Sequence, residues 1–293
     1  MAWLQLSITT PKEQAPLIEA LFENMGAHAI TLGDGGDDPI LEPNLGELPL
    51  WHATTITALF EGDHDPDELR SLINQSLNAD CSRQLKIARL EEQVWERAWL
   101  ADFHPMPFGQ RLWVCPAGQR PDTDHAIILE LDPGLAFGTG THPTTALCLK
   151  WLDSIDLKDQ TVIDFGCGSG ILAIAALLLG AKQSIATDHD PQALQATLDN
   201  AKKNQVESRL TIKEPGQLPA MQADILLANI LAGTLIQLEP LLASQVKPGG
   251  RILLSGILIE QAEEVRQAFR AHFKIPPPTV QKEWVALEGI RRC

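Results

Sequence analysis

Residues 161–180 constrain the fold of this chain more than any other stretch. The stretch opens as a short β-branched and aromatic run and then places glycine at three alternate positions, Gly166, Gly168 and Gly170. Residues 171–179 follow with the length and apolar composition of a buried helix. A strand, a glycine loop and a helix in this order let a ligand approach the backbone and present N–H groups to it. The stretch therefore predicts a doubly wound α/β domain that binds a nucleoside-containing cofactor at the carboxyl end of its first strand.

The spacing of the glycines distinguishes two classes of cofactor. The dinucleotide pattern G-x-G-x-x-G would require glycine where this chain has Ile171. Asp164 instead stands two residues before Gly166, and a second expected strand, 184–187, ends in Asp188. An acid at that tip, roughly 20 residues beyond the glycines, accepts hydrogen bonds from ribose hydroxyls. Asp-x-Gly-x-Gly-x-Gly resembles the first motif of the class I S-adenosylmethionine (SAM) methyltransferases, and the resemblance implies SAM rather than an NAD-type cofactor.

Charge and cysteine content bear on partners and location. A formal net charge of −15 over 293 residues disfavours a nucleic-acid surface, which is normally basic. The five cysteines are scattered and show no C-x-x-C spacing, which argues for a reducing compartment and no metal site. The amino terminus lacks the pattern of a signal peptide, and no apolar run reaches membrane-spanning length. We therefore expect a cytoplasmic protein without a metal, a membrane segment or direct nucleic-acid recognition.

Residues 1–88 have a pattern of their own. On the first helix we expect Leu17, Leu21 and Phe22 to share the buried face. The order βαββαβ predicts a small ferredoxin-like α+β domain. The expected strands cover 3–9, 27–32, 51–60 and 85–90, and the expected helices cover 12–25 and 66–77.

The same residues hold most of the negative charge. Residues 1–88 contain fourteen Asp and Glu against four Lys and Arg. This excess is either a solvated surface or a docking module for a basic partner, and the cofactor domain needs no such module for its chemistry. We divide the chain into an acidic substrate-recognition domain over 1–88, a helical linker over 89–104 and a methyltransferase domain over 105–293.

The third segment alternates strands and helices. This order predicts a Rossmann-like, mostly parallel seven-stranded sheet with both faces covered. Residues 111–115 and 126–130 are expected to enter the domain as an antiparallel pair, and 279–284 with 285–292 to close it as another. Further expected strands cover 162–165, 184–187, 209–213, 223–228 and 251–256, and expected helices cover 171–179, 191–204 and 260–273.

Residues 131–145 form a second informative stretch, rich in glycine and threonine. Pro143 suits the first position of a helix, with Thr141 or His142 as its N-cap and Thr145 in its first turn. Free N–H groups and hydroxyls at a helix start suit a carboxylate such as that of the methionine part of SAM. An ordinary capped helix is the alternative. For His142 we favour capping or positioning over a role as a base.

The fourth strand of the expected sheet ends in Asn229-Ile-Leu-Ala, at the same edge as the glycine loop and Asp188. This segment is uncharged, and a carboxylate here would hold a lysine amine in its protonated, unreactive form. Asn229 is our candidate for positioning an amine, and the sequence identifies no general base. Enzymes that methylate nucleic-acid amino groups usually carry Asn/Asp-Pro-Pro-aromatic at this position, and release-factor glutamine methyltransferases also carry the two prolines. This chain has Ile230 and Leu231 instead, which disfavours both of these substrate classes.

Together, the stretch 131–145, the glycine loop and Asn229-Ile-Leu-Ala closely resemble the PrmA family, the bacterial methyltransferases of ribosomal protein L11. The resemblance covers the whole chain. It implies methylation of lysine ε-amines and the α-amine of that basic protein. It also implies cofactor contacts at Thr145, Gly166, Asp188 and Asn229, to which our own interpretation adds Asp164, Gly168 and Thr141. The alternatives are a SAM enzyme acting on another protein or on nucleic-acid amino groups, a non-catalytic SAM-binding protein, and a nicotinamide oxidoreductase.

Overall fold

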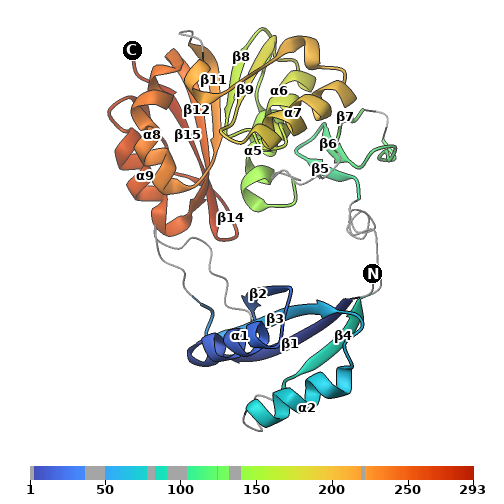
Figure 1. The fold of residues 1–293 in the computed structure, drawn as a ribbon. Helices are drawn as coiled ribbons and strands as arrows, with labels where there is room; N and C mark the ends of the chain where they lie inside the picture. The colour runs from blue at the N-terminus through green and yellow to red at the C-terminus, as the bar shows by residue number, and fades with distance from the viewer. Residues whose placement is uncertain are drawn as a thin grey trace. The chain divides into compact units, whose positions relative to one another are not determined.

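The chain divides into two compact units, Met1–Ala98 and Trp99–Cys293 (Figure 1). The last described strand of the first unit ends at Leu90. Residues 89–90 therefore belong to the sheet of that unit and not to the predicted linker. The rest of that linker up to residue 103 lies outside the described residues. The computed structural model describes residues 3–36, 50–77, 83–90, 104–123, 125–131, 140–218 and 222–293.

The first unit has the predicted order βαββαβ, with one short 3-10 turn before its first helix. Its strands form one antiparallel sheet in the order β2-β3-β1-β4, and the two helices among its described residues cover one face of it (Figure 1). This confirms the ferredoxin-like arrangement. The elements are β1 (Trp3–Pro11), α1 (Ala15–Asn24), β2 (Ala29–Asp34), β3 (Ala53–Glu61), α2 (Pro66–Ser76) and β4 (Lys86–Leu90).

The buried face of α1 differs from the predicted one. Leu17 is 63% exposed, whereas Ala15, Ile18 and Phe22 are buried against the sheet. The prediction was wrong at Leu17 because the stripe that packs on the sheet runs through Ala15, Ile18 and Phe22, at intervals of three and four residues, and Leu17 lies outside it.

The second unit contains an eight-stranded sheet. Seven strands follow one another in the order β10-β9-β8-β11-β12-β15-β13, and β14 pairs with β15. The strands from β10 to β12 pair in parallel and β15 runs antiparallel to β12, as the sequence predicts for a Rossmann-like sheet. The short β13 makes the seventh strand and β14 adds an eighth. The strands are β8 (Thr161–Phe165), β9 (Gln183–Thr187), β10 (Leu210–Lys213), β11 (Ala223–Asn229), β12 (Val246–Leu258), β13 (Phe273–Lys274), β14 (Thr279–Gln281) and β15 (Trp284–Arg291).

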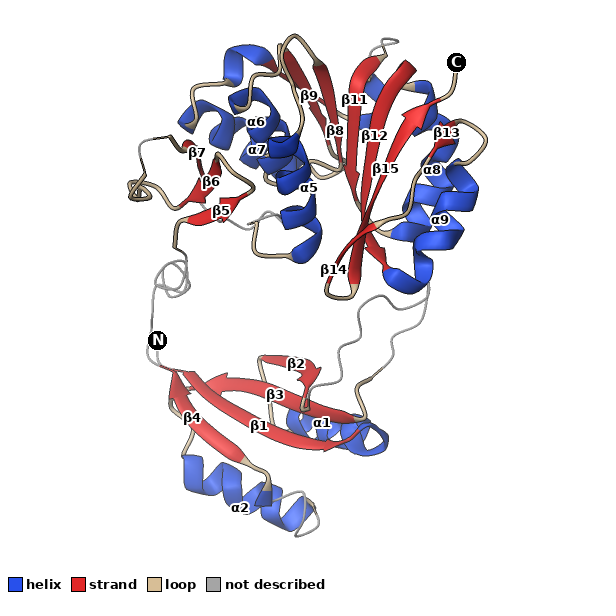
Figure 2. Cartoon of the chain, turned by 180° about the vertical axis from the view of Figure 1, so that it is seen from behind, coloured by secondary structure: helices blue, strands red, loops and turns tan. Residues whose placement is uncertain are grey.

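Helices cover both faces of this sheet (Figure 2). Alternate residues of β11 enter two separate cores: Ile225 and Leu227 pack on one face, and Leu226 and Ala228 on the other. This alternation is expected for a central strand that is buried on both sides. On one face lie α5 (Pro143–Ser154), α6 (Ile171–Leu178) and α7 (Pro191–Lys203), and on the other lie α8 (Ala232–Ser244) and α9 (Ala262–Phe269).

A separate three-stranded sheet lies at the start of the second unit. It consists of β5 (Met106–Phe108), β6 (Leu112–Cys115) and β7 (Ile127–Glu130), in that order. β6 pairs with β7 in parallel, so the predicted antiparallel pair is wrong. The connection over 116–126 is long enough to return the chain to the end at which β6 began, which a parallel pair requires.

Candidate active site

Four neighbouring parallel strands of the second unit end at one edge of the sheet. In the register, Phe165 at the end of β8 is paired with Thr187 of β9 and with Ala228 of β11. Asn229 is paired in turn with Ser255 of β12. The segments that leave these strands, including the glycine loop, therefore begin side by side at the carboxyl edge, where open α/β sheets bind ligands.

The glycine loop adopts a backbone that side chains would obstruct. Gly166, Gly168 and Gly170 have φ of 76°, 53° and 78°, in the left-handed region that favours glycine. A Cβ on Gly166 would lie 2.5 Å from Cγ2 of Ile230, and one on Gly170 would lie 2.7 Å from Cγ2 of Thr197. The loop therefore needs glycine at these two positions for space as well as for conformation.

Asp188 lies directly after β9, next to this loop. Its side chain is nearly buried, and Oδ2 accepts a hydrogen bond of 3.0 Å from the N–H of Gly168. Oδ1 accepts one of 3.1 Å from the N–H of Asp190 and lies 3.2 Å from Nδ1 of His189. The structure thus brings together the strand-tip acid and the glycine loop that the sequence singles out, and it fixes the orientation of the carboxylate.

Asp164 is buried beneath the loop, 1% exposed. Its Oδ2 accepts a hydrogen bond of 3.0 Å from the N–H of Ala173, in the first turn of α6. The N-cap of α6 is Gly170, which has no side chain, so Asp164 supplies the capping acceptor from the preceding strand. Oδ1 is buried without a hydrogen-bond partner among the described residues. Burial, helped by the nearby charge of Asp188 and opposed by the Ala173 hydrogen bond, raises the pKa of Asp164 to about 7.

The start of α5 meets the tip of β11. Nδ2 of Asn229 donates a hydrogen bond of 3.3 Å to Oγ1 of Thr145, which is 1% exposed. This bond leaves Oδ1, the acceptor atom of the amide, on the other branch of the Asn229 side chain. Thr141 is exposed just before the helix. The structure therefore joins two predicted site residues that are far apart in sequence.

His142 is the N-cap of α5, as the sequence allows. Its Nδ1 accepts from the N–H of Thr144 at 3.4 Å and lies 2.7 Å from the Thr144 hydroxyl. The imidazole packs edge-on against the ring of Trp284, with ring centroids 4.9 Å apart. Burial lowers the pKa of His142, which keeps Nδ1 available as an acceptor. These contacts favour capping over a role as a base.

Sequence reasoning missed several residues that build this site. Thr197 and Asn200 of α7 bond to carbonyls of the glycine loop, and Ser255 of β12 donates to the carbonyl of Thr144 at 3.2 Å. The sequence did carry a signal for the two α7 residues. Ala193, Thr197 and Asn200 follow one another at intervals of four and three residues, so both polar residues fall on the buried stripe of the helix. Ser255 and Trp284 carried no comparable signal.

These residues fit a nucleoside cofactor that is not a dinucleotide. The loop presents backbone rather than side chains, with a fixed carboxylate at one side and an unpartnered buried oxygen beneath it. Ile171, where a dinucleotide site would have its third glycine, is buried in the first turn of α6. Among the described residues, no group of three or more His, Cys, Asp or Glu is placed to hold a metal ion.

Comparison with known proteins identifies the family. Residues 2–292 match the family described as ribosomal protein L11 methyltransferase (PrmA). The chain belongs to this family. It is 50% identical over 291 residues to the ribosomal protein L11 methyltransferase of Hahella chejuensis, covering 99% of both chains. It is also 50% identical over 293 residues to that of Azotobacter vinelandii, covering 100% of both. A crystal structure of ribosomal protein L11 methylase from Lactobacillus delbrueckii subsp. bulgaricus is 33% identical, with a TM-score of 0.60, covering 65% of this chain and 100% of that one.

Membership in the PrmA family confirms the resemblance seen in the sequence. The chain is a SAM-dependent protein methyltransferase, and the nicotinamide alternative is set aside. The roles of individual residues stay predictions, and residues 132–139 of the threonine-rich stretch lie outside the described part of the chain. Within that described part, no helix combines the length and the apolar character that crossing a membrane requires.

Proposed function

We propose that this enzyme transfers methyl groups from SAM to the lysine ε-amines and the N-terminal α-amine of ribosomal protein L11. The observation that carries the proposal is the bond between Asn229 and Thr145 at the carboxyl edge of the sheet, beside the glycine loop. It places an uncharged amide at the site where an amine would meet the cofactor. Family membership supports the choice of protein substrate.

Four groups of residues hold the cofactor in this proposal. Gly166 and Gly168 give the loop its left-handed backbone, and Asp188 accepts hydrogen bonds from the ribose hydroxyls of the cofactor. The unpartnered Oδ1 of Asp164 offers a buried hydrogen-bond acceptor for its ammonium group. The first turn of α5, with Thr145 and the preceding Thr141, receives its carboxylate through N–H groups and hydroxyls. When bound, SAM supplies an electrophilic methyl group.

Asn229 positions the attacking amine. A lysine amine has an ordinary pKa near 10.4, so presenting it neutral at pH 7 costs about 4–5 kcal/mol. A carboxylate in contact with the amine would raise that cost by stabilising the ammonium form. The segment from Asn229 to Ala232 carries no charge, and Oδ1 of Asn229 accepts a hydrogen bond from the amine without adding one. Catalysis then consists mainly of alignment, with water taking the proton.

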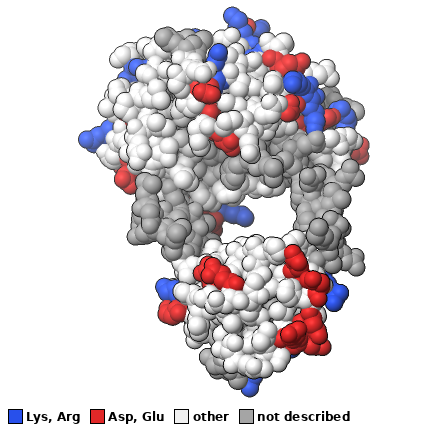
Figure 3. All heavy atoms as spheres, viewed as in Figure 1, with Lys and Arg blue, Asp and Glu red and all other residues white. Residues whose placement is uncertain are grey.

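The first unit recruits the substrate. Its acidic residues spread over the visible face of the unit, with basic residues at the margins (Figure 3). A ribosomal protein is basic, so the charges favour its approach. We place the docking function in residues 1–88 and the methyl transfer in residues 105–293. We also propose that the enzyme acts in the cytoplasm and does not recognise nucleic acid directly.

Transfer of labelled methyl groups tests this function. The purified enzyme is incubated with labelled SAM and an extract of cells that lack it, and labelled molecules are identified by mass spectrometry. The expected result is label in one small basic ribosomal protein, at its amino terminus and at lysines. Label in RNA or metabolites with none in protein would overturn the substrate, while label in a different protein would restrict the proposal to protein methylation.

A further inference from the structure

Two side chains of α7 hold consecutive carbonyl groups of the glycine loop. Oγ1 of Thr197 donates a hydrogen bond of 3.0 Å to the carbonyl of Gly168, and Nδ2 of Asn200 donates one of 2.9 Å to the carbonyl of Ser169. Thr197 is 0% exposed and Asn200 is 6% exposed. The face of the loop toward α7 is therefore sealed by protein, and a ligand must approach from the carboxyl edge of the sheet.

The loop needs such restraint because of its own composition. Three glycines in five residues leave an unusually large number of backbone conformations, and ordering them costs more entropy than ordering other residues. In a planar trans peptide the C=O and the next N–H point in opposite directions. Fixing the Gly168 carbonyl on α7 therefore directs the N–H of Ser169 away from α7.

Thr197 also fixes the loop sterically. A Cβ on Gly170 would lie 2.7 Å from its Cγ2, so the threonine methyl packs directly against the glycine. Its hydroxyl lies 3.3 Å from Sγ of Cys167. One side chain thus contacts three of the five loop residues: Cys167, Gly168 and Gly170.

The helix that carries these side chains is itself held at both ends. At its start, Asp190 is the N-cap and its N–H donates to Oδ1 of Asp188. Just after its end, Nδ2 of Asn204 donates 2.7 Å to the carbonyl of Glu130, and Oδ1 of Asn204 accepts 2.8 Å from the Glu130 N–H. α7 is therefore a fixed support, and its position is transmitted to the loop through Thr197 and Asn200.

We propose that Thr197 and Asn200 are positioning residues of the SAM site: they fix the glycine loop in its ligand-binding conformation before the cofactor arrives. This inference rests on the proposed placement of SAM at that loop. Neither residue belongs to the motifs that identify the family in the sequence. Loss of either donor releases one carbonyl, so the loop samples other conformations and part of the binding energy is used to order it.

Binding of SAM to the full-length protein, measured by calorimetry, tests the proposal. Thr197→Val and Asn200→Leu keep approximate side-chain size and remove the donors. Each is expected to raise the Kd for SAM about ten-fold, the equivalent of one unmade hydrogen bond. The turnover rate at saturating SAM should stay within about two-fold, because bound cofactor orders the loop. Thr197→Ser, which retains the hydroxyl, should restore most of the affinity.

Thr54→Val is the matched control. Thr54 lies in the first unit, is 0% exposed and donates a partly buried hydrogen bond of 2.7 Å to the carbonyl of Trp51, as Thr197 does to Gly168. The Thr54→Val variant should have a lower melting temperature than the wild type and an unchanged Kd for SAM. If Thr197→Val also lowers the melting temperature but leaves the Kd for SAM unchanged, Thr197 has only a structural role and the inference is wrong. The Thr197→Val result decides the question even if Asn200→Leu fails to fold. If Asp188→Ala also leaves the Kd unchanged, the proposed SAM site itself is wrong.

Discussion

Asp188 connects the glycine loop to the turn after β9, and its replacement is the most direct test of the cofactor site. Asp188→Ala removes the acceptor proposed for the ribose hydroxyls, and a hydrogen bond to a charged group is worth roughly 1.5–3 kcal/mol. We expect SAM to bind one to two decades more weakly, at ~1.4 kcal/mol per decade. Calorimetric titration with SAM measures this. Wild-type affinity in a folded variant would remove Asp188 from the site.

Asp164 predicts a pH dependence of stability. Its folded pKa of about 7 lies above its ordinary value of 3.8 because burial penalises the charged form. Between these two values the folded state binds more protons than the unfolded state, so this residue's contribution to the free energy of unfolding falls as the pH rises. From about pH 5 to pH 8 the loss is roughly 2–3 kcal/mol. Above pH 7 the buried carboxylate is charged in the folded protein.

Asp164→Asn isolates this contribution from those of all other titrating groups. The amide keeps an oxygen that can accept from the N–H of Ala173, but it does not titrate. Urea unfolding of the cofactor-free proteins at both pH values gives the two differences. We expect the wild type to lose more stability than Asp164→Asn as the pH rises. Equal losses in the two proteins would show that Asp164 is ionised normally.

The candidate residues were predictable to the extent that their chemistry was local. Gly166, Gly168, Asp164 and Asp188 stand at fixed distances from a strand end, and the carboxyl edge of the sheet brings them together. The bond from Asn229 to Thr145 was not predictable as a contact, because it depends on where α5 packs against the sheet.

Among the elements, α5 depends on an unusual cap. His142 fills the position usually taken by Ser, Thr, Asp or Asn, and Nδ1 accepts the Thr144 N–H in their place. His142→Ala removes the acceptor and should lower the free energy of unfolding by about 1 kcal/mol. His142→Asn restores a capping acceptor while also removing the imidazole from Trp284.

Urea unfolding of the two variants therefore separates the cap from the ring contact. The Asn variant is expected to be the more stable of the two. If His142→Ala and His142→Asn lower the free energy of unfolding equally, His142 stabilises the protein by packing against Trp284 and not by capping α5.

The elements that the sequence did not predict lack local signals. α8 begins after Leu231, which provides no side-chain cap, and contains Pro240, so the usual start is missing and a helix breaker is present. β12 also includes Pro248-Gly-Gly, a pattern typical of a turn. These residues lie between Val246 and Arg251, which both pair with β11, at the point where the register of that pairing shifts. The βαββαβ order and the alternating second unit were predictable because hydrophobic periodicity determines them.

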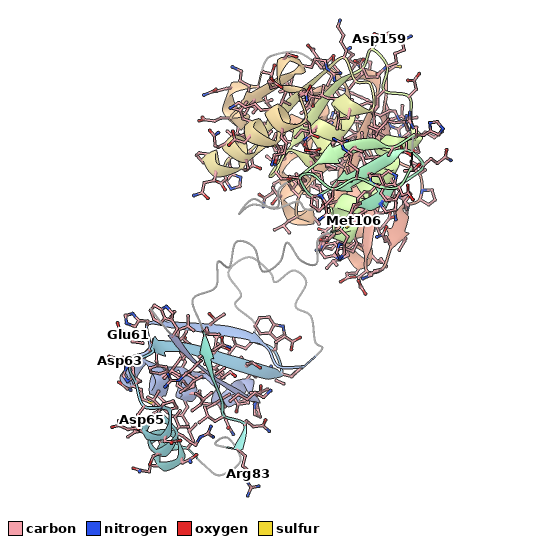
Figure 4. All side chains as sticks on the ribbon, turned by 90° about the vertical axis from the view of Figure 1, so that its right-hand side faces the viewer. Glu61, Asp63, Asp65, Arg83, Met106 and Asp159 are labelled. Atoms are coloured by element: carbon pink, nitrogen blue, oxygen red, sulfur yellow. The ribbon has the colours of Figure 1, made fainter. Side chains whose placement is uncertain are left out.

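For the molecule as a whole, the separation of charge from chemistry is the feature with the widest consequence. The acidic excess lies in the first unit, while the segment at Asn229, which we propose positions the amine, is uncharged. Within the first unit, Glu61, Asp63 and Asp65 lie together at one edge, where β3 leads into α2 (Figure 4). All three are exposed. Long-range attraction can therefore act there without stabilising the ammonium form of the amine that reacts.

Neutralising this edge in the full-length enzyme tests that separation. The variant Glu61→Gln, Asp63→Asn and Asp65→Asn preserves a capping side chain at Asp65, so the fold should be retained. We expect the KM for the basic protein substrate to rise about three- to ten-fold at low salt, while kcat and the Kd for SAM stay unchanged. The difference from wild type should shrink as salt screens the charges.

The matched control neutralises three exposed acids of the second unit, Asp159→Asn, Glu207→Gln and Glu264→Gln, and so changes the net charge by the same amount. Steady-state kinetics at several salt concentrations compares the two. If steering depends on the first unit, only the first variant raises KM. An equal rise in both would mean that net charge alone attracts the substrate, and a fall in kcat in the first variant would mean that its acids act on the chemical step.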